Sequence, residues 1–286
     1  MKRILVTGGS GLLGVKLVSV LKNLGFIVVS HGRSSGVDVI CDLTFQSETQ
    51  DMLDTVEPDV IINLAALTDV DQCERTPDRA YFSNTKIVGN ISKWVKEHEG
   101  CYLLQISTDQ VYNSVGPHVE MDHILSNYYA FSKYAGELLA LQASGGVLRT
   151  NFFGKSLLNS RASMSDWVLK NLRSNTPIAV FTDVMFSPLS INTLCKMIIL
   201  MIKKRQAGLF NLGSSEGMSK ADFAFKLAEN FGFNGSNMTR EKSESKNLFA
   251  YRPKDMRMDS SLFESVFKIK LPTLAQEIVN LRSDYD

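Results

Sequence analysis

The chain has 286 residues, of which 44% are hydrophobic, so it is long enough to bury the core of one large domain or of two fused lobes. Lys and Arg number 31 against 30 Asp and Glu, which gives a net charge of +1 and no electrostatic reason to expect a nucleic acid or a membrane surface as partner. Four widely spaced cysteines match no metal-binding pattern, so we expect free thiols, no metal and a cytoplasmic protein.

The N-terminal stretch predicts a strand, a glycine turn and a helix. A β-branched run at 3–7 leads into Gly8, Gly11 and Gly14, and apolar residues follow at 15–21 in a helical pattern. These glycines allow a tight turn, close approach of the backbone to a pyrophosphate, and close packing of the helix on a sheet. The helix N-terminus adds oriented N–H donors for phosphates. We interpret this segment as the start of a dinucleotide-binding fold rather than as a merely structural turn.

The end of the second predicted strand, at 26–30, bears on the choice of cofactor. Many NAD sites place Asp or Glu there to bind the ribose 2′-hydroxyl, whereas this chain has Arg33 and no acid. Arg33, with His31 and Ser34 as further candidates, is suited to a 2′-phosphate, which favours NADPH, although a solvated surface arginine is the alternative. A third strand is expected at 37–41. After it, Asp42 either lies at the adenine or caps the following segment.

Small residues end the fourth predicted strand, at 60–66. Ala65 and Ala66 would let a cofactor lie against the backbone at the carboxyl edge of an open α/β sheet, where such sheets bind ligands. A long helical segment is expected at 78–97. Its Asn84 either braces the site through backbone contacts or is an ordinary polar residue on a helix face.

The fifth predicted strand, at 102–106, leads directly into two hydroxyl side chains. A hydroxyl at the end of a central strand can donate a hydrogen bond to a substrate carbonyl. Thr108 is our choice for this role, with Ser107 as the alternative. The segment that follows is expected to be an active-site loop, with His118 and His123 on its surface rather than in a metal site.

Tyr129 and Lys133 are the main catalytic candidates. They stand four residues apart in a helix-compatible segment, so their side chains share one helical face. A phenol normally titrates near pKa ~10, and a nearby ammonium lowers that pKa by favouring the phenolate. Such a pair suits proton delivery to a carbonyl oxygen, although Tyr-x-x-x-Lys also arises by chance.

The second half of the chain predicts a smaller lobe interleaved with the sheet. We assign residues 1–154 to a dinucleotide-binding domain, to which 181–212 partly return, and 155–180 with 213–286 to a substrate-binding lobe. The expected fold class is therefore α/β, a Rossmann-type doubly wound parallel sheet with a smaller C-terminal α/β substrate lobe.

Three features of this lobe carry specific expectations. Ser219 is expected to cap a helix whose phenylalanines pack in the core. Residues 233–250 are rich in Ser, Asn, Lys and Glu, and predict an exposed linker or a mobile flap. Arg252 follows, and either binds the pyrophosphate of a substrate or belongs to a solvated loop.

Taken together, these motifs resemble those of the extended short-chain dehydrogenases/reductases, and within them the dTDP-4-dehydrorhamnose reductase-like proteins. The segments that carry the resemblance are 7–14, 63–66, 68–74, 107–112, 129–137, 148–150, 186–188 and 252–253. The resemblance implies that Tyr129 donates a proton, that Lys133 supports it and holds the nicotinamide ribose, and that Thr108 completes the triad. It implies Thr108, Asp109 and Phe152 near the sugar. The cofactor site that it implies comprises Gly8, Ser10, Gly11, Leu12, Leu13, Gly14, Arg33, Asp42, Leu43, Ala65, Ala66, Leu67, Tyr129 and Lys133.

Two departures from related enzymes narrow the expected reaction. The sugar-nucleotide 4,6-dehydratases carry Asp-Glu after the threonine, and here the second position is Gln110, whose amide cannot shuttle a proton. The GDP-fucose synthase group has a cysteine where Asp109 stands, so epimerisation is disfavoured. What remains is reduction, with NADPH or alternatively NADH, of the C4 ketone of a nucleotide-linked 4-keto-6-deoxy sugar. The alternatives are a non-catalytic NADP-binding regulatory subunit, or an epimerase or dehydratase. The oligomeric state is left open, with a homodimer among the options.

Overall fold

The structure is a computed structural model that describes residues 2–246 and 248–285. The chain divides into two compact units. The first contains the chain up to Thr108, Asn127–Arg149 and Cys195–Phe210. The second contains Asp109–Ser126, Thr150–Leu194 and the chain from Asn211 onward. Residues 109–126, which the sequence analysis placed with the dinucleotide-binding part, thus belong to the second unit.

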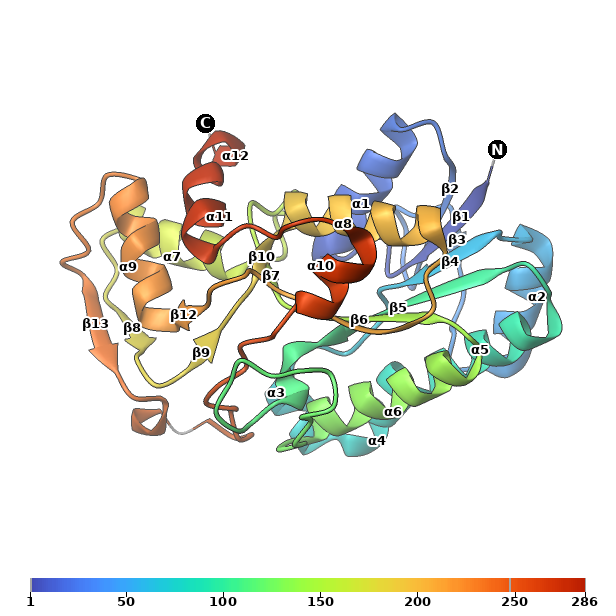
Figure 1. Ribbon diagram of the computed structural model, residues 1–286, viewed down its shortest axis with the longest axis horizontal. Coiled ribbons are helices and arrows are strands. Elements are labelled where there is room, and N and C mark those ends of the chain that lie inside the picture. Colours follow the sequence, from blue (N-terminus) through green and yellow to red (C-terminus); the bar gives the residue numbers. More distant parts are fainter. Residues whose placement is uncertain (1, 247, 286) are drawn as a thin grey trace. The chain divides into compact units, whose positions relative to one another are not determined.

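Most of a seven-stranded sheet lies in the first unit (Figure 1). Its strands are β1 (Arg3–Thr7), β2 (Ile27–Gly32), β3 (Val39–Ile40), β4 (Val60–Asn63), β5 (Tyr102–Thr108), β6 (Gly146–Thr150) and β11 (Gly208–Leu212). Their order is β11-β6-β5-β4-β1-β2-β3, and β1 pairs in parallel with both β2 and β4. The strand order therefore reverses between β1 and β4. Open α/β sheets bind ligands at the carboxyl ends of the strands beside such a reversal.

Helices cover both faces of this sheet. The helices of the first unit are α1 (Leu12–Asn23), α2 (Gln46–Val56), α3 (Val70–Arg75), α4 (Pro77–Tyr81), the π-helix η1 (Phe82–Lys86), α5 (Ile87–Glu97), α6 (Tyr128–Gln142) and most of α8 (Ile191–Lys204). Figure 1 shows α2, α5 and α6 on one side of the sheet and α1 on the other. Apolar residues of α2, α5 and α6 form one core cluster with Leu5, Ile61 and Val147 of the strands. The predicted Rossmann-type, doubly wound parallel sheet is therefore confirmed.

In the part of the second unit that the structure describes there are three two-stranded sheets and several helices. Its strands are β7 (Phe152–Phe153), β8 (Ile178–Phe181), β9 (Met185–Phe186), β10 (Leu189–Ser190), β12 (Met218–Ser219) and β13 (Met238–Glu241), paired as β10-β7, β12-β9 and β13-β8. Its helices are η2 (Asp109–Val111), α7 (Met164–Arg173), the start of α8 (Ile191–Lys204), α9 (Lys220–Asn230), η3 (Ser243–Ser245), α10 (Ser261–Phe267), α11 (Leu274–Asn280) and α12 (Arg282–Tyr285).

Phenylalanines form the centre of the second unit. The ring of Phe223 packs edge-on against Phe153 and Phe186, with centroids 4.8 and 5.5 Å apart. The side chain of Ser219 accepts a hydrogen bond from the backbone N–H of Asp222, 3.0 Å away, and so caps α9. Both expectations for this helix, the cap and the apolar packing, are confirmed.

The prediction of an exposed linker or flap over 233–250 is wrong for part of that segment. Residue 247 lies outside the described residues, but 238–241 form β13, which pairs in parallel with β8. Met238 is buried in the core of the unit, whereas Thr239 and Arg240 are exposed. Met238 is the only buried apolar residue of β13, so the sequence shows no alternation of apolar and polar residues that would predict a strand here.

Candidate functional site

The predicted glycine turn lies against the strands on both sides of β1. The N–H of Gly9 donates to the carbonyl of His31 in β2, 2.8 Å away. Gly8 has a φ of +65°, and a Cβ there would lie 2.9 Å from the backbone nitrogen of Ala65, just after β4. A side chain at Gly8 would therefore collide with the chain beyond β4. The turn brings bare backbone to the strand reversal, as a dinucleotide-binding turn requires.

Among the described residues, no side chain caps the first turn of α1. Its N-cap residue is Gly11, which has no side chain to accept hydrogen bonds from the N–H groups of Leu12, Leu13 and Gly14. The first N–H groups of a helix have no partner within the helix, and they carry its partial positive charge. The hydroxyl of Ser10, just before this turn, lies near the end of β2: a Cβ on Gly32 would be 3.1 Å from it. These groups fit the pyrophosphate of a dinucleotide.

The charges at the end of β2 fit a 2′-phosphate better than a bare ribose. Arg33 is exposed and makes no hydrogen bond or ion pair with any residue that the structure describes. The carboxylate of Asp38 accepts hydrogen bonds from the N–H and the hydroxyl of Ser30, at 2.8 and 2.7 Å, and these bonds lower its pKa. Lys22 lies 3.7 Å from the same carboxylate. Asp38 is thus held by the protein, and Arg33 is available for a ligand.

Asp42 and Leu43 have structural contacts of their own. The carboxylate of Asp42 accepts hydrogen bonds from the N–H and hydroxyl of Thr44, so it caps the turn that follows β3. The side chain of Leu43 is buried in the core. Between the two roles proposed for Asp42, the structure favours the cap.

The imidazole of His31 is buried beside this turn. Its Nε2 lies 3.1 Å from the carbonyl oxygen of Cys41, and its Nδ1 has no partner among the described residues. Burial lowers the pKa of His31, against smaller opposing effects of the Cys41 carbonyl and the Asp42 carboxylate. His31 is therefore a neutral ring at neutral pH.

Asn84 ties the loop after β4 to helix α6. Its side-chain oxygen accepts from the N–H of Leu67 at 2.8 Å, and its amide donates to the carbonyl of Leu67 at 3.0 Å. The same amide lies 3.0 Å from the hydroxyl of Ser132. Asn84 therefore braces the loop that carries Ala65 and Ala66, which was one of its two predicted roles.

Tyr129 and Lys133 lie on one face of α6, which packs against β5. The side chain of Asn127 caps this helix by accepting from the N–H of Ala130, 2.8 Å away. The ammonium of Lys133 is buried and donates to the carbonyl oxygen of Ile106 at 2.6 Å. Burial lowers the pKa of Lys133 to about 8, although the charge of Glu137 acts in the opposite direction. The lysine is therefore anchored two residues before Thr108.

The hydroxyl of Ser107 is already engaged. It donates to the carboxylate of Glu137, which is itself paired with the guanidinium of Arg149. Successive side chains of a strand point to opposite faces, so Thr108 points away from the face that Ser107 occupies. Of the two candidates for the substrate carbonyl, the structure favours Thr108, which is buried at the end of β5.

In the second unit, Asp109 and Arg252 lie near a lysine that the sequence analysis missed. Asp109 is buried and accepts from the side-chain amide of Asn151 at 2.6 Å. Lys220 is the first residue of α9. Burial lowers the pKa of Lys220, the charge of Asp109 raises it and that of Arg252 lowers it. A basic residue directly after a capping serine was the sequence signal that could have identified Lys220. Phe152, in β7, is half-buried.

The prediction that His118 lies on a loop surface is wrong. Its ring is 1% exposed and stacks on Tyr112, with centroids 4.8 Å apart and an interplanar angle of 4°. Its Nε2 lies 3.0 Å from the carbonyl oxygen of Asp255. These contacts give His118 a packing role within the second unit. His123 is half-buried.

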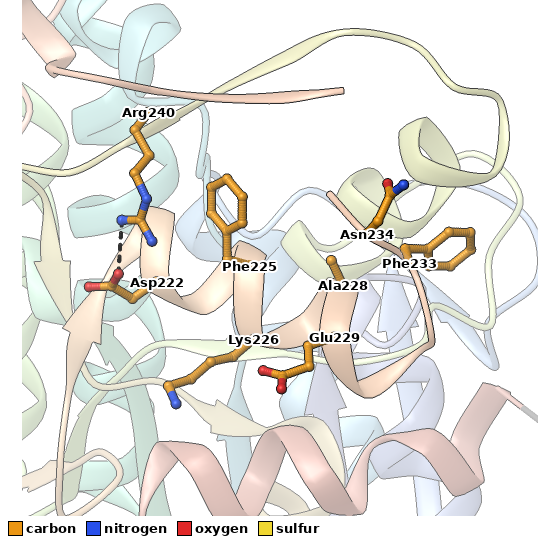
Figure 2. Close-up of a pocket in the computed structure, with 8 residues that line it drawn as sticks. All are labelled: Asp222, Phe225, Lys226, Ala228, Glu229, Phe233, Asn234 and Arg240. Carbon is orange, nitrogen blue, oxygen red and sulfur yellow. Dashed lines mark hydrogen bonds and ion pairs between the residues drawn. The ribbon is translucent and has the colours of Figure 1, made fainter. Parts of the chain in front are cut away.

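A surface groove on the second unit lies beside α9 and β13 and has a volume of about 430 Å³ (Figure 2). Within it, Arg240 forms an ion pair with Asp222 at 2.9 Å and stacks 4.6 Å from the ring centroid of Phe225. No predicted site residue lines this groove. The residues that line it are Asp222, Phe225, Lys226, Ala228, Glu229, Phe233, Asn234 and Arg240.

Three general expectations can be compared with the described part of the chain. All four cysteines are unpaired thiols, as predicted. Within residues 2–246 and 248–285, no group of three His, Cys, Asp or Glu side chains is placed to hold a metal ion. In the same residues, no helix has the length and apolar character needed to cross a membrane.

Comparison with known proteins agrees with this geometry. Residues 1–286 match the family described as RmlD substrate binding domain. The dTDP-4-dehydrorhamnose reductase of Shigella flexneri is 28% identical over 94% of this chain and 93% of its own length. Methionine adenosyltransferase 2 subunit beta of Rattus norvegicus is 25% identical over 93% of this chain and 82% of its own length.

A solved structure has the same fold. The dTDP-4-dehydrorhamnose reductase of Bacillus anthracis in complex with NADP superposes with a TM-score of 0.90 at 24% identity, covering 99% of each chain. The chain belongs to the RmlD substrate binding domain family, and the prediction that it is an NAD(P)H-dependent sugar-nucleotide oxidoreductase is confirmed.

Proposed function

We propose that this chain uses NADPH to reduce the C4 ketone of a nucleotide-linked 4-keto-6-deoxy sugar, the reaction named for its dTDP-4-dehydrorhamnose reductase relatives. One observation carries the proposal. The buried ammonium of Lys133 is anchored at 2.6 Å to the strand that ends in Thr108, on the helix face that also carries Tyr129. A cation, a phenol and a hydroxyl in this arrangement serve the reduction of a carbonyl group.

Each of the three side chains has a separate task in this reaction. Thr108 donates a hydrogen bond to the ketone oxygen, and Tyr129 transfers its phenolic proton to that oxygen as it becomes an alcohol. Bound NADPH supplies the hydride that C4 accepts. Lys133 stabilises the phenolate left on Tyr129 until solvent returns the proton. Because the pKa of Lys133 is about 8, Lys133 is cationic in most molecules at neutral pH, as stabilisation of the phenolate requires.

The cofactor preference rests on Arg33. A guanidinium binds phosphate oxygens in a bidentate manner and keeps its charge at every relevant pH. Arg33 is exposed at the end of β2, and the nearby acid Asp38 is held by Ser30. NADPH is therefore the proposed cofactor, with the pyrophosphate at the turn that contains Gly8 and Gly11.

The phosphates of the substrate are assigned to the second unit. Lys220 and Arg252 lie close enough for the charge of Arg252 to lower the pKa of Lys220. Asp109 offsets one of these positive charges, and the net positive charge that is left favours an anionic ligand. We assign these two side chains to the pyrophosphate of the sugar nucleotide.

The test is turnover of defined sugar nucleotides. The protein is incubated with NADPH and with dTDP-, UDP-, GDP- and CDP-linked 4-keto-6-deoxy sugars, and oxidation of the cofactor is followed by absorbance. Tyr129→Phe should lower turnover by about 10²-fold or more, because it removes the proton donor. NADPH binding by this variant should persist. Full activity of Tyr129→Phe, or no oxidation with any of the sugars, would contradict the proposal.

A second candidate function is suggested by the similarity to methionine adenosyltransferase 2 subunit beta. In that case the chain would bind NADP and regulate a partner enzyme without catalysis. Tight cofactor binding without turnover, together with a stable complex with another enzyme, would support this function. The buried arrangement of Tyr129 and Lys133 favours catalysis. A third function, epimerisation or dehydration, would place solvent deuterium at C3 or C5 of the product.

Two further assignments remain predictions. A homodimer is one option for the oligomeric state, and sedimentation of the purified chain distinguishes it from a monomer. The cytoplasmic location is tested by fractionation of cells that express the protein.

A further inference from the structure

A fully buried ion pair lies next to the catalytic candidates of the first unit. The side chains of Glu137, on α6, and Arg149, on β6, are both completely shielded from solvent. The guanidinium approaches the carboxylate as a fork, with Nε 3.0 Å from Oε1 and Nη2 2.6 Å from Oε2. This geometry fixes the carboxylate of Glu137 in one orientation.

The oriented carboxylate also holds the end of β5. It accepts a hydrogen bond from the hydroxyl of Ser107. Ser107 stands between Ile106, whose carbonyl anchors the ammonium of Lys133, and Thr108. Glu137 is therefore hydrogen-bonded to Ser107, which stands between Ile106 and Thr108. Through its contacts with Ser107 and Arg149, it connects α6 with β5 and β6.

Glu137 also places a negative charge one helical turn from Lys133. At a spacing of four residues the two side chains lie on the same face of α6. Burial is the largest effect on the pKa of Lys133 and lowers it, whereas the charge of Glu137 and, less, Cys73 from α3 raise it. Lys133 also contacts the Ile106 carbonyl, and Glu137 also contacts the Ser107 hydroxyl and the Arg149 guanidinium. The phenol of Tyr129 lies one helical turn before Lys133 on the same face of α6.

A buried ion pair is a costly way to stabilise a fold. Removing two charges from water costs several kcal/mol each, and well-packed apolar residues of similar size often replace such a pair without loss. A contribution to stability therefore does not explain why Glu137 and Arg149 are buried together. Positioning of the neighbouring side chains does explain it.

We propose that Glu137 is a positioning residue of the reduction. Held by Arg149, it fixes Ser107 between Ile106, which anchors Lys133, and Thr108, and it places a negative charge one helical turn from Lys133. Its effect on turnover rests on the proposed function. Its effect on the charge of Lys133 does not depend on any substrate.

The first readout is the pH profile of kcat/KM for the full-length protein. Glu137→Gln keeps the shape of the side chain and removes its charge, so the alkaline limb should move down by about 1 pH unit. Because this variant leaves Arg149 unpaired and can fail to fold, Glu137→Gln combined with Arg149→Met is the second variant, and a smaller shift in the same direction is expected. Ser107→Ala keeps both charges, so it should lower kcat and leave the pH limb in place.

Glu277→Gln is the matched control. Glu277 is another buried carboxylate that accepts a serine hydroxyl, from Ser190 at 2.7 Å, and it belongs to the second unit. This variant should lower the melting temperature and leave the pH profile unchanged. The same pattern in both Glu137 variants, a lower melting temperature with an unmoved pH limb, would overturn the proposal.

The second readout follows the titration of Lys133 directly. The protein carries ¹³C-labelled lysine, and the ¹³Cε resonance of Lys133 is assigned by its loss in Lys133→Arg. Its midpoint should fall in Glu137→Gln and, less, in the double variant. If the wild-type protein turns over no sugar nucleotide, the proposed function fails while this titration still decides the role of Glu137. A midpoint that is identical in the wild type and both variants would refute that role.

Discussion

Gly136 sets the distance between helix α6 and the π-helix η1. A Cβ at this position would overlap the backbone carbonyl oxygen of Asn84 and lie 3.2 Å from Cγ2 of Val88. Gly136→Ala should therefore push α6 away from η1. Because Asn84 holds Leu67 and Ser132, the displacement should also reach the loop after β4 and the helix that carries Lys133.

The expected loss of stability follows from two opposing effects. Overpacking of a well-packed interior costs about 1–3 kcal/mol, and the upper end applies here because the overlapping atom belongs to the backbone and cannot rotate away. Alanine gains about 1 kcal/mol over glycine in helix propensity. The net destabilisation is about 2 kcal/mol, which corresponds to a fall of about 4–8 °C in melting temperature for a chain of this size.

The assay is thermal unfolding of Gly136→Ala beside Gly89→Ala. Gly89 lies in α5, and a Cβ there would meet only Cδ1 of Leu139, at an ordinary 3.4 Å. The control gains the same helix propensity without an overlap, so its melting temperature should stay the same or rise. Equal melting temperatures for the two variants would show that α6 and η1 do not approach as closely as described. Turnover should fall only in Gly136→Ala.

Three other predictions concern charged side chains. Because the pKa of Lys133 is about 8, turnover should decline above pH 8. Between about pH 8 and 10.5 the unfolded chain binds more protons than the folded chain, so the free energy of unfolding should rise with pH. Denaturant titrations of Lys133→Met should not show that rise. Arg33→Ala should raise the Kd for NADPH about tenfold, a loss of about 1.4 kcal/mol, and change that for NADH much less; equal losses measured by cofactor fluorescence would contradict the 2′-phosphate assignment. Lys220→Ala should raise KM for the sugar nucleotide at an unchanged kcat, whereas the exposed Lys226→Ala on the same helix should have no effect.

The sequence was most informative where the relevant contacts are local. The turn that contains Gly8 and the spacing of Tyr129 and Lys133 are set within a few residues, so strand, turn and helix patterns located them correctly. The parallel sheet was expected from the same pattern, because strands that alternate with helices form parallel βαβ units, but the order of the strands came from the structure. The choice between Ser107 and Thr108 needed the structure.

Features that depend on distant partners could not be predicted. His118 is buried because Asp255, far along the chain, supplies a carbonyl to its ring. The role of Glu137 depends on Arg149, whose side chain reads as an ordinary charged residue in the sequence. The helix predicted at 78–97 contains a π-helical turn around Asn84 that was not predicted. The spacing of apolar residues in the sequence does not reveal a single turn with one residue more than an α-helical turn.

The late position of β11 in the chain affects how the protein is made. On the ribosome, the strands from β1 to β6 emerge long before residues 208–212, and until these arrive β6 is an edge strand with unpaired backbone groups. The sheet is complete only after much of the second unit has been synthesised, so chaperone protection during translation should matter more here than for a protein whose sheet is encoded in one uninterrupted segment.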